Sequence, residues 1–390
     1  MKGVTSRVEE LASVAGADIV SEREGRLIAS PRTTEDVAAV LRYADTNGIG
    51  VQVVGAATKR DWAAAVHGDL VLEMRGLTGV GEHSWQDLTA TVRAGTVWAE
   101  MQRTLAEHRQ MVALDPLWAE RATVGGVIAT NDSGTLRLRY GGLRDLVIGM
   151  TIVLADGTIA RSGGKVVKNV AGYDLHKLMI GAFGTLAVVT EVTFRLHAIP
   201  RSTRVWSFEP ADAEACGEVL MKVLDSQLSV QAMQLRASGS GFALDVQIAS
   251  SDEVMREQWN VLNSFAGCDG ASADDVLAVR QRLFAGDGIV LKLTMLPSAI
   301  ARLSAEVVRL GGEAVTQGSG IMLARVAGGS AVERLREFVA AHGEGAVTVL
   351  RGADGLGVLP SAGDAAGLMR EIKRRFDPKG TLNPGVAVGG

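Results

Sequence analysis

The pattern of apolar and polar residues along the chain changes near Pro200. Before it, apolar residues recur three and four positions apart between Val37 and Ala44, which predicts a helix that begins at Thr33 or Thr34 and ends at Gly48. The other apolar runs of this part predict strands at 49–54, 70–74, 88–94 and 186–196, a hairpin over 146–162 that turns at Asp156-Gly157, a helix capped by Thr96, and a helix near 174–180.

Beyond Pro200 the order βαββα occurs twice, which is typical of ferredoxin-like split βαβ units. The two copies show no clear identity at matching positions. We therefore expect residues 201–360 to form an α+β cap with two halves side by side. The elements expected there are strand 205–209, helix 212–228, strands 230–236 and 241–249, helix 251–266, strand 288–296, helix 298–310, strands 312–317 and 319–327, helix 330–342 and strand 346–352, followed by a last helix over 364–376.

The composition removes several classes of function. A net charge of −4 leaves no basic excess to pair with phosphates, so nucleic acid is not expected as the main partner. Cys216 and Cys268 form no CxxC and cannot alone ligate an iron–sulfur cluster or zinc, so we expect reduced thiols in the cytoplasm. The N-terminus shows no apolar signal-peptide core, and the longest apolar run, Leu146–Ala155, is too short to cross a bilayer.

Three glycine-containing segments carry the candidate chemistry. The first, Val53–Trp62, reads VVGAATKRDW, a strand that enters a loop of small residues. Backbone amides in such a loop can form a nest for a pyrophosphate. The segment is neither a Rossmann fingerprint nor a P-loop, and taken alone it is better interpreted as a surface turn.

The other two segments are more specific. Leu114–Met150 contains ATVGG, then SG, RYG and RD, and Gly163–Val192 contains GGKVVKNVAGYDLHKLMIGAFGTLAVVTEV. Glycines inside apolar runs weaken strands, and they are used where backbone must come close to a neighbour or a ligand. The glycines therefore indicate that backbone comes close to a neighbour or a ligand in both segments.

Together these segments resemble the FAD-binding domain of the vanillyl-alcohol-oxidase (PCMH-type) flavoproteins, and within them the FAD-binding E subunits of bacterial glycolate oxidase. The resemblance covers residues 28–200 and 370–386. It implies a PCMH-type FAD-binding domain of two α/β subdomains over 1–200 and a segment over 361–390 that returns to this domain. Together with the ferredoxin-like cap over 201–360, which is expected from its own pattern, the chain is predicted to have an α+β fold with three parts.

The first loop departs from the family's usual GGGTKxDWG. Ala56, Ala57 and Ala63 stand where the family has glycine, and alanine restricts a positive φ. Many relatives bind FAD covalently through a histidine in this loop, whereas here the first histidine is His67, past the matched stretch. The resemblance therefore implies noncovalent FAD.

The resemblance also implies which residues contact FAD. Asn383 would approach the isoalloxazine ring, and Lys168 would either place positive charge near the flavin or form a structural ion pair. His176 is interpreted as a packed histidine rather than a base. The full implied set is Gly55, Ala56, Ala57, Thr58, Lys59, Asp115, Thr123, Gly125, Gly126, Asn131, Ser133, Gly134, Arg139, Tyr140, Gly141, Lys168, Gly184, Leu186, Val188, Val189 and Asn383.

A substrate site is not evident. The catalytic relatives carry an HxGDGNxH-type metal motif in the cap, and no two of the six histidines here are spaced as HxH or HxxxH. We therefore expect no metal, and the catalytic residues stay unknown. Arg325 and Arg351, on expected cap strands, are candidates to hold a carboxylate by residue type alone.

The resemblance implies an FAD-dependent oxidoreductase, namely the FAD-binding subunit of a glycolate oxidase (glycolate dehydrogenase) complex that oxidises glycolate to glyoxylate. The implied partners are a larger FAD-linked 2-hydroxy-acid oxidase subunit and an iron–sulfur subunit, in the cytoplasm or held at the inner membrane by those partners. Two alternatives stay open. One is a self-sufficient FAD-dependent 2-hydroxy-acid or alcohol dehydrogenase, and the other is a non-catalytic assembly subunit with the flavoprotein fold.

Overall fold

The computed structural model describes residues 4–63, 66–164, 173–273, 279–342, 345–352 and 365–386. The chain divides into two compact units. Unit 1 consists of Met1–Asp132, Gly142–Ile199 and Ser361–Gly390, and unit 2 consists of Ser133–Gly141 and Pro200–Pro360. Residues 1–200 were expected to form one domain, whereas the segment Ser133–Gly141 belongs to unit 2.

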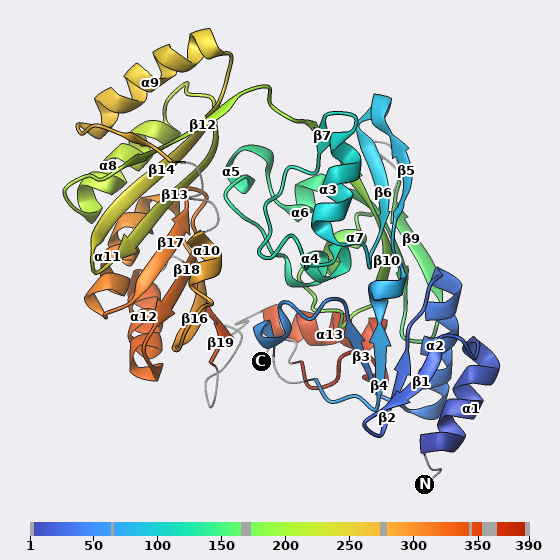
Figure 1. Ribbon diagram of the computed structural model, residues 1–390. Coiled ribbons are helices and arrows are strands. Elements are labelled where there is room, and N and C mark those ends of the chain that lie inside the picture. Colours follow the sequence, from blue (N-terminus) through green and yellow to red (C-terminus); the bar gives the residue numbers. More distant parts are fainter. Residues whose placement is uncertain are drawn as a thin grey trace. The chain divides into compact units, whose positions relative to one another are not determined.

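Unit 1 holds two sheets with separate cores (Figure 1). The first sheet has the order β1-β2-β4-β3, in which β2, β4 and β3 run parallel. The second is antiparallel, with the order β5-β6-β10-β8-β9. Their strands are β1 (Val20–Arg23), β2 (Arg26–Ala29), β3 (Val51–Val54), β4 (Leu70–Glu73), β5 (Val80–Ser84), β6 (Thr89–Arg93), β8 (Val147–Val153), β9 (Ile159–Gly163) and β10 (Val188–Arg195).

The helices of unit 1 follow the local signals to different degrees. Helix α2 (Thr34–Asn47) has the expected capping box between Thr33 and Asp36 and ends at Gly48 with φ +63°. The predicted cap at Thr96 is wrong, because Val97 precedes α3 (Trp98–Ala106) and the Thr96 hydroxyl bonds to Gly79 instead. The remaining helices are α1 (Val4–Ala15), α4 (Val124–Thr130), α6 (Leu143–Leu146) and α7 (His176–Met179), and a two-stranded ribbon joins β7 (Gln110–Met111) to β11 (His197–Ala198).

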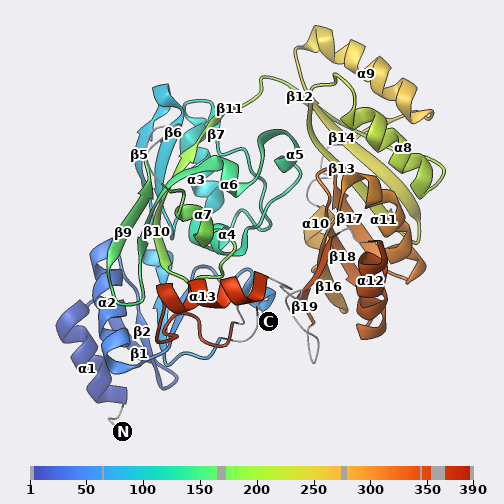
Figure 2. The same ribbon diagram turned by 180° about the vertical axis from the view of Figure 1, so that it is seen from behind.

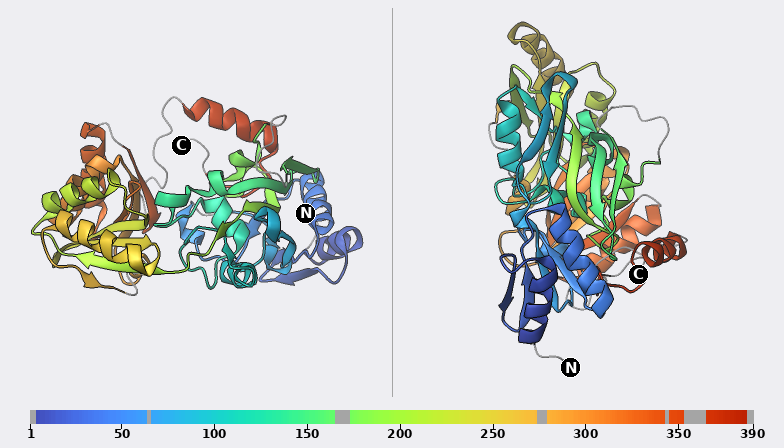
Figure 3. Two further views of the ribbon diagram at one scale, coloured as in Figure 1. Left: turned by 90° about the horizontal axis from the view of Figure 1, so that it is seen from above. Right: turned by 90° about the vertical axis from the view of Figure 1, so that its right-hand side faces the viewer.

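The C-terminal segment belongs to unit 1. Helix α13 (Ala366–Phe376), red in Figure 3, is followed by a turn that brings Leu382 beside Val51 in a parallel bridge. Residues more than three hundred positions apart thus meet at the free edge of β3.

Unit 2 is an eight-stranded antiparallel sheet with the order β15-β12-β14-β13-β17-β18-β16-β19. Each half has its strands in the order fourth, first, third, second, as in a ferredoxin-like unit, and the halves join through β13 and β17. The predicted double βαββα order is confirmed. The strands are β12 (Thr203–Phe208), β13 (Val230–Ser238), β14 (Gly241–Ala249), β15 (Ala271–Ser272), β16 (Ile289–Thr294), β17 (Glu313–Gln317), β18 (Ile321–Val326) and β19 (Ala346–Arg351).

The long helices of unit 2 cover one face of this sheet (Figure 2). Apolar residues at every second position of the strands meet the apolar stripes of the helices in one core. The helices are α8 (Ala213–Leu224), α9 (Asp252–Ala266), α11 (Ile300–Arg309) and α12 (Gly329–His342), with the short α5 (Arg137–Tyr140) and α10 (Val279–Arg282) in addition.

Candidate functional site

The loop that follows β3 keeps several backbone donors open. Within the described residues, the N–H groups of Ala56, Ala57 and Thr58 donate no hydrogen bond. Ala57 has φ +55°, in the left-handed region. Successive unpaired amides around a left-handed residue are a backbone arrangement that binds anions. The loop therefore offers the kind of donors that a pyrophosphate needs.

Helix α4 fixes this loop at both ends. A Cβ added to Gly55 would lie 2.3 Å from the Thr123 hydroxyl oxygen, so only glycine fits where the loop begins. Thr123 is the N-cap of α4, and its hydroxyl accepts from the N–H of Gly126 at 3.3 Å. Where the loop ends, the Lys59 ammonium lies 3.1 Å from Asp132, just beyond α4. The loop is thus anchored to residues on either side of this helix.

A cavity of about 130 Å³ lies among the loop, α4 and the C-terminal tail. Two small residues of α4, Gly126 and Ala129, form part of its wall, together with Phe183 and Asn383. An adjoining cavity of about 80 Å³ shares several of these residues and extends to Gly184 and the start of β10. Both are below the ~300 Å³ of a typical ligand pocket, so within unit 1 they would enclose a segment of a large cofactor.

The structure brings together expected cofactor residues from three distant segments and the tail. Those that line one or both cavities are Gly55, Ala56, Ala57, Thr58, Lys59, Thr123, Gly125, Gly126, Gly184, Val188, Val189 and Asn383. Leu186 instead belongs to the core of unit 1, and Asp115 and Asn131 do not line these two cavities. Lys168 lies outside the described residues.

Five of the expected residues, Ser133, Gly134, Arg139, Tyr140 and Gly141, belong to unit 2. The Ser133 carbonyl accepts hydrogen bonds from buried Arg280 and Gln317, both at 3.2 Å, and the Tyr140 hydroxyl donates to Gln231 at 2.5 Å. Leu138 packs against the apolar core of unit 2. These contacts explain why this short piece of the second glycine segment leaves unit 1.

Gly125 has a different local role from the one expected. Its N–H already donates to the Ala94 carbonyl at 2.7 Å, and the N–H of Val124 donates to Thr96 at 2.9 Å. A Cβ on Gly125 would come within 3.1 Å of the Ala94 side chain. Close packing of α4 on the end of β6 therefore accounts for this glycine, and its amide is not open to a phosphate.

Asn383 joins the tail to two other segments. Its side-chain oxygen accepts from the N–H of Val53 at 2.8 Å, and its amide nitrogen donates to the Phe183 carbonyl at 2.6 Å. A Cβ on Gly184 would lie 2.8 Å from that nitrogen, which explains the glycine there. Lys373 and buried Asp377 fix the preceding turn, since the carboxylate accepts from the ammonium and from two tail amides.

Backbone strain is concentrated on the segments that build the site. Of the eight non-glycine residues with positive φ in the described chain, five lie on the segments that build the site, namely Ala57, Trp118, Asn131, Phe183 and Asn383. Such conformations cost roughly 1–3 kcal/mol each and persist where the surroundings impose them, as at ligand clamps. The left-handed φ of Phe183 and Trp118 could not be predicted from the sequence, because it is glycine and asparagine that usually indicate such a turn.

The two cap arginines that were expected to hold a carboxylate, Arg325 and Arg351, instead bind backbone carbonyls of the cap. Arg351 donates to the carbonyls of Phe284 and Gly286, and Arg325 donates to the Ala285 carbonyl and pairs with Glu313. Both guanidinium groups therefore hold the turn before β16. The expectation from residue type is not supported by their contacts.

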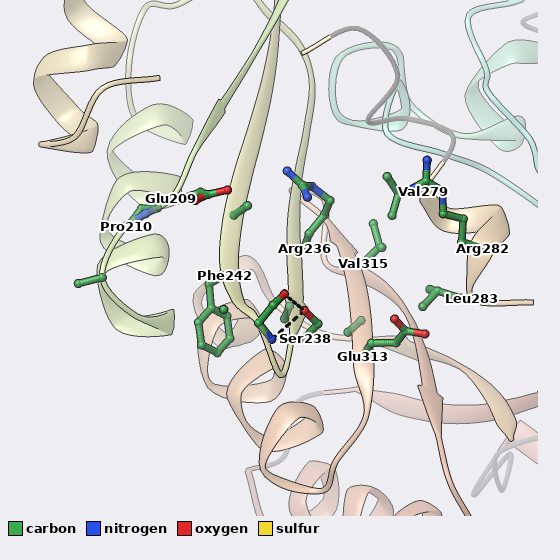
Figure 4. Close-up of a pocket in the computed structure, with 16 residues that line it drawn as sticks. Glu209, Pro210, Arg236, Ser238, Phe242, Val279, Arg282, Leu283, Glu313 and Val315 are labelled. Carbon is green, nitrogen blue, oxygen red and sulfur yellow. Dashed lines mark hydrogen bonds between the residues drawn. The ribbon is translucent and has the colours of Figure 1, made fainter. Parts of the chain in front are cut away.

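Figure 4 shows a cavity of about 510 Å³ in unit 2, between the β13–β14 hairpin, β17 and α10. Its charged lining residues are Arg236, Arg282, Glu209 and Glu313. Asp245 binds Arg236 through both carboxylate oxygens, at 2.8 and 3.0 Å. Because the two arginines and two glutamates balance, this lining has no net preference for an anion.

The remaining candidates have structural surroundings. His176 is buried beside the Ser162 hydroxyl, at 3.2 Å from Nδ1, and burial lowers its pKa. Burial raises the pKa of the Cys216 thiol to about 12. Among the described residues, no three His, Cys, Asp or Glu side chains gather as a metal site, and no helix is long and apolar enough to cross a membrane.

The first loop fits the diphosphate part of a dinucleotide cofactor. Three successive amides without a partner, on a turn of alanines and glycine, present donors with no bulky side chain in the way. Comparison with known proteins agrees. The FAD binding domain family matches residues 26–163, and the C-terminal domain of FAD linked oxidases matches residues 361–387.

A solved structure shows the same fold over nearly the whole chain. p-Cresol methylhydroxylase superimposes with a TM-score of 0.74 over 99% of this chain and 97% of its own, at 14% identity. The fold and the loop–α4 site therefore define a PCMH-type flavoprotein, with FAD as its cofactor.

Curated relatives narrow this class. D-lactate dehydrogenase of Archaeoglobus fulgidus is 30% identical over 94% of this chain and 92% of its own length. The chain belongs to the FAD-linked oxidase family that contains this protein. Glycolate oxidase subunit GlcE of Escherichia coli is 28% identical over 80% of this chain and 86% of its own, and subunit GlcD of Bacillus subtilis is 35% identical over 48% and 41%. The chain spans about two fifths of the length of the first curated relatives it matches.

Proposed function

We propose that this chain is the FAD-binding subunit of a complex that oxidises glycolate to glyoxylate. The observation that carries the proposal is the extent of the similarity to GlcE, which covers 86% of that subunit, against 41% of GlcD. A likeness over most of a subunit supports a shared role better than a likeness over one domain.

FAD is proposed to bind noncovalently. The described loop residues, Gly55–Ala63, include no histidine or cysteine that could attach to the flavin ring. The open amides of Ala56–Thr58 would hold the pyrophosphate, and Asn383 would support the loop through β3. When bound, FAD supplies an acceptor for the hydride of a hydroxy acid.

The proposed partners are a larger FAD-linked 2-hydroxy-acid oxidase subunit and an iron–sulfur subunit. The two cysteines of this chain offer too few thiolates for a cluster, so electrons from its flavin would leave through another chain. We place the complex in the cytoplasm, or at the inner membrane through those partners.

Two measurements test this proposal in order. The purified chain should be yellow, and acid precipitation should release about one FAD per chain into the supernatant, as a noncovalent site requires. Colour left in the pellet would show a covalent bond, and a colourless chain that FAD cannot reconstitute would favour a non-catalytic assembly subunit. The complex should then lose glycolate oxidation when this chain is left out; full activity and flavin content without it would refute the subunit role.

A second candidate is a self-sufficient FAD-dependent D-2-hydroxy-acid dehydrogenase. The nearly full-length match to the Archaeoglobus fulgidus D-lactate dehydrogenase favours it. The hydrogen bonds of Arg325 and Arg351 to loop carbonyls count against this candidate, because these two side chains were the cap cations expected to hold a substrate carboxylate. Reduction of an artificial electron acceptor by the isolated FAD-loaded chain with D-lactate or glycolate would establish this candidate over the first.

A further inference from the structure

A lysine that the sequence assigns to the cofactor is instead buried beneath the first loop. The side chains of Lys59 and Asp132 are each 4% exposed, and the ammonium nitrogen lies 3.1 Å from the carboxylate. The same nitrogen donates to the Leu117 carbonyl at 3.2 Å and lies 5.6 Å from the ring centroid of Trp118 and 5.8 Å from that of Trp62. The carboxylate and the carbonyl can accept from two of the three ammonium donors, and the two indole rings lie near its charge.

Stability alone gives a weak reason for such a pair. Two charges lose their hydration on burial, and a well-packed apolar pair of similar volume is often as stable or more so. An ion pair differs from an apolar pair in being directional, and here it fixes one point of the loop to one point beyond α4. Asp132 is itself held, because it accepts from the N–H of Leu117 at 2.8 Å.

The turn between the two anchors needs that support. Gly55 is fixed against Thr123 and Lys59 against Asp132, while Ala57 between them holds a left-handed φ of +55°. Alanine leaves that region readily unless its neighbours prevent it, and the three open amides would then lose their common orientation.

We infer that Lys59 is a positioning residue: through Asp132 it holds the turn Ala56–Thr58 in the strained shape that FAD requires, and it does not itself contact the phosphates. This inference rests on the FAD-binding part of the proposed function. It assigns the lysine charge to the protein interior and leaves the contact with the diphosphate to backbone amides.

The test separates stability from cofactor affinity. Lys59→Met and Asp132→Leu alone should each lower the melting temperature, because each leaves one buried charge unpaired. The double variant should melt above either single variant, since no buried charge remains, and below the parent, since the Leu117 N–H loses its acceptor. Its FAD dissociation constant, from quenching of flavin fluorescence far below melting, should nevertheless stay roughly tenfold weaker, the cost of re-ordering one left-handed residue.

A rescue variant distinguishes positioning from direct contact. Adding Ala57→Gly to the double variant should recover most of the lost FAD affinity, because glycine adopts the left-handed region without strain. If Lys59 touched the phosphates, glycine at this position would restore nothing, and that result would overturn the inference. Parent-like FAD affinity in the double variant would also overturn it.

The control changes the same residue types elsewhere in unit 1. Lys379, 55% exposed, pairs at 2.8 Å with Asp45, 15% exposed, and neither lines the cavities. Lys379→Met with Asp45→Leu should leave FAD affinity unchanged. A parent chain that binds no FAD would refute the proposed function and this inference together. A parent that binds FAD without joining a glycolate-oxidising complex would refute the function alone.

Discussion

The first loop of unit 1 and the sheet of unit 2 use their polar groups in opposite ways. In the cap, buried Asp245 accepts from Arg236 and from Gln234, and Arg351 satisfies loop carbonyls, so hydrogen bonding closes the structure on itself. In the loop, the amides of Ala56–Thr58 stay open while a buried ion pair holds the backbone under strain. Polar groups stabilise the fold in the first case. In the second, the fold keeps polar groups available for a ligand.

The two buried aspartates give the largest test of this difference. Asp132→Ala leaves the Lys59 ammonium buried without its carboxylate, and we expect a loss of about 3–5 kcal/mol in the free energy of unfolding. Asp245→Ala leaves Arg236, whose side chain is 31% exposed and can regain water, so a loss of about 1–3 kcal/mol is expected. Urea unfolding of the FAD-free chain measures both, and equal losses would remove the contrast.

Substitution of one glycine in the first loop and one in the cap compares how tightly the backbone is packed in the two regions. Gly55→Ala places a methyl group 2.3 Å from the Thr123 hydroxyl, so we expect a loss of about 1–3 kcal/mol and of retained FAD. Gly239→Ala, in the β13–β14 hairpin of the cap, meets nothing within 4 Å and should change neither property. Thermal unfolding and flavin retention on gel filtration decide this. An FAD-loaded, parent-like Gly55→Ala would show that loop and helix can separate at no cost.

Strain in the loop predicts a stabilising substitution. Ala57→Gly should raise the free energy of unfolding by about 1 kcal/mol, because glycine tolerates φ +55° without the clash that alanine suffers. Ala56→Gly, next to it and without a positive φ, should lower stability by roughly 0.5–1 kcal/mol through the greater freedom of the unfolded chain. Urea midpoints compare the two variants, and a change of the same sign in both would contradict the strain at Ala57.

The smallest difference concerns pH. Burial lowers the pKa of His176 and of His197, both in unit 1, although Asp174 partly opposes the shift at His176. Below pH ~6.5 the unfolded chain therefore binds protons that the folded unit does not. The free energy of unfolding should therefore decrease as the pH is lowered below ~6.5, by at most about 1.4 kcal/mol per pH unit for each histidine.

The variant His176→Gln tests the share of one histidine. Its urea midpoint should depend less steeply on pH between 5 and 7 than that of the parent. The cap offers the contrast. Its resolved shifts raise the pKa of Arg236, Arg309 and Cys216 and lower the pKa of Glu306, and all four groups titrate outside this window. An unchanged slope in the variant would mean that His176 takes up protons equally in both states.

Much of the fold could be predicted because its signals are local. Helix α2 has its cap residues and apolar stripe within one stretch, and the strands and helices of the cap alternate with clear periods. The glycine segments likewise indicated the family, whose FAD binding domain matches residues 26–163. The two cap halves were expected side by side, and the strands that join them, β13 and β17, are seen only in the structure.

The roles of individual site residues could not be predicted, because they depend on distant partners. Lys59 has the same sequence context whether it meets a phosphate or Asp132, and only the fold brings that carboxylate beneath the loop. Gly125 looks like a phosphate-binding glycine, yet its amide is taken by Ala94. Arg351 looks like a substrate cation until the turn at Phe284 is seen to occupy it.

The bridge between Leu382 and Val51 has a consequence for synthesis. The Asn383 side chain and the amide of Val53, 330 positions earlier, form one hydrogen bond at the edge of the first sheet. During translation every strand of the cap emerges from the ribosome before that edge can close, so the cap can fold while the flavin site is still unfinished. This edge of the flavin site can therefore close only after residue 383 has left the exit tunnel.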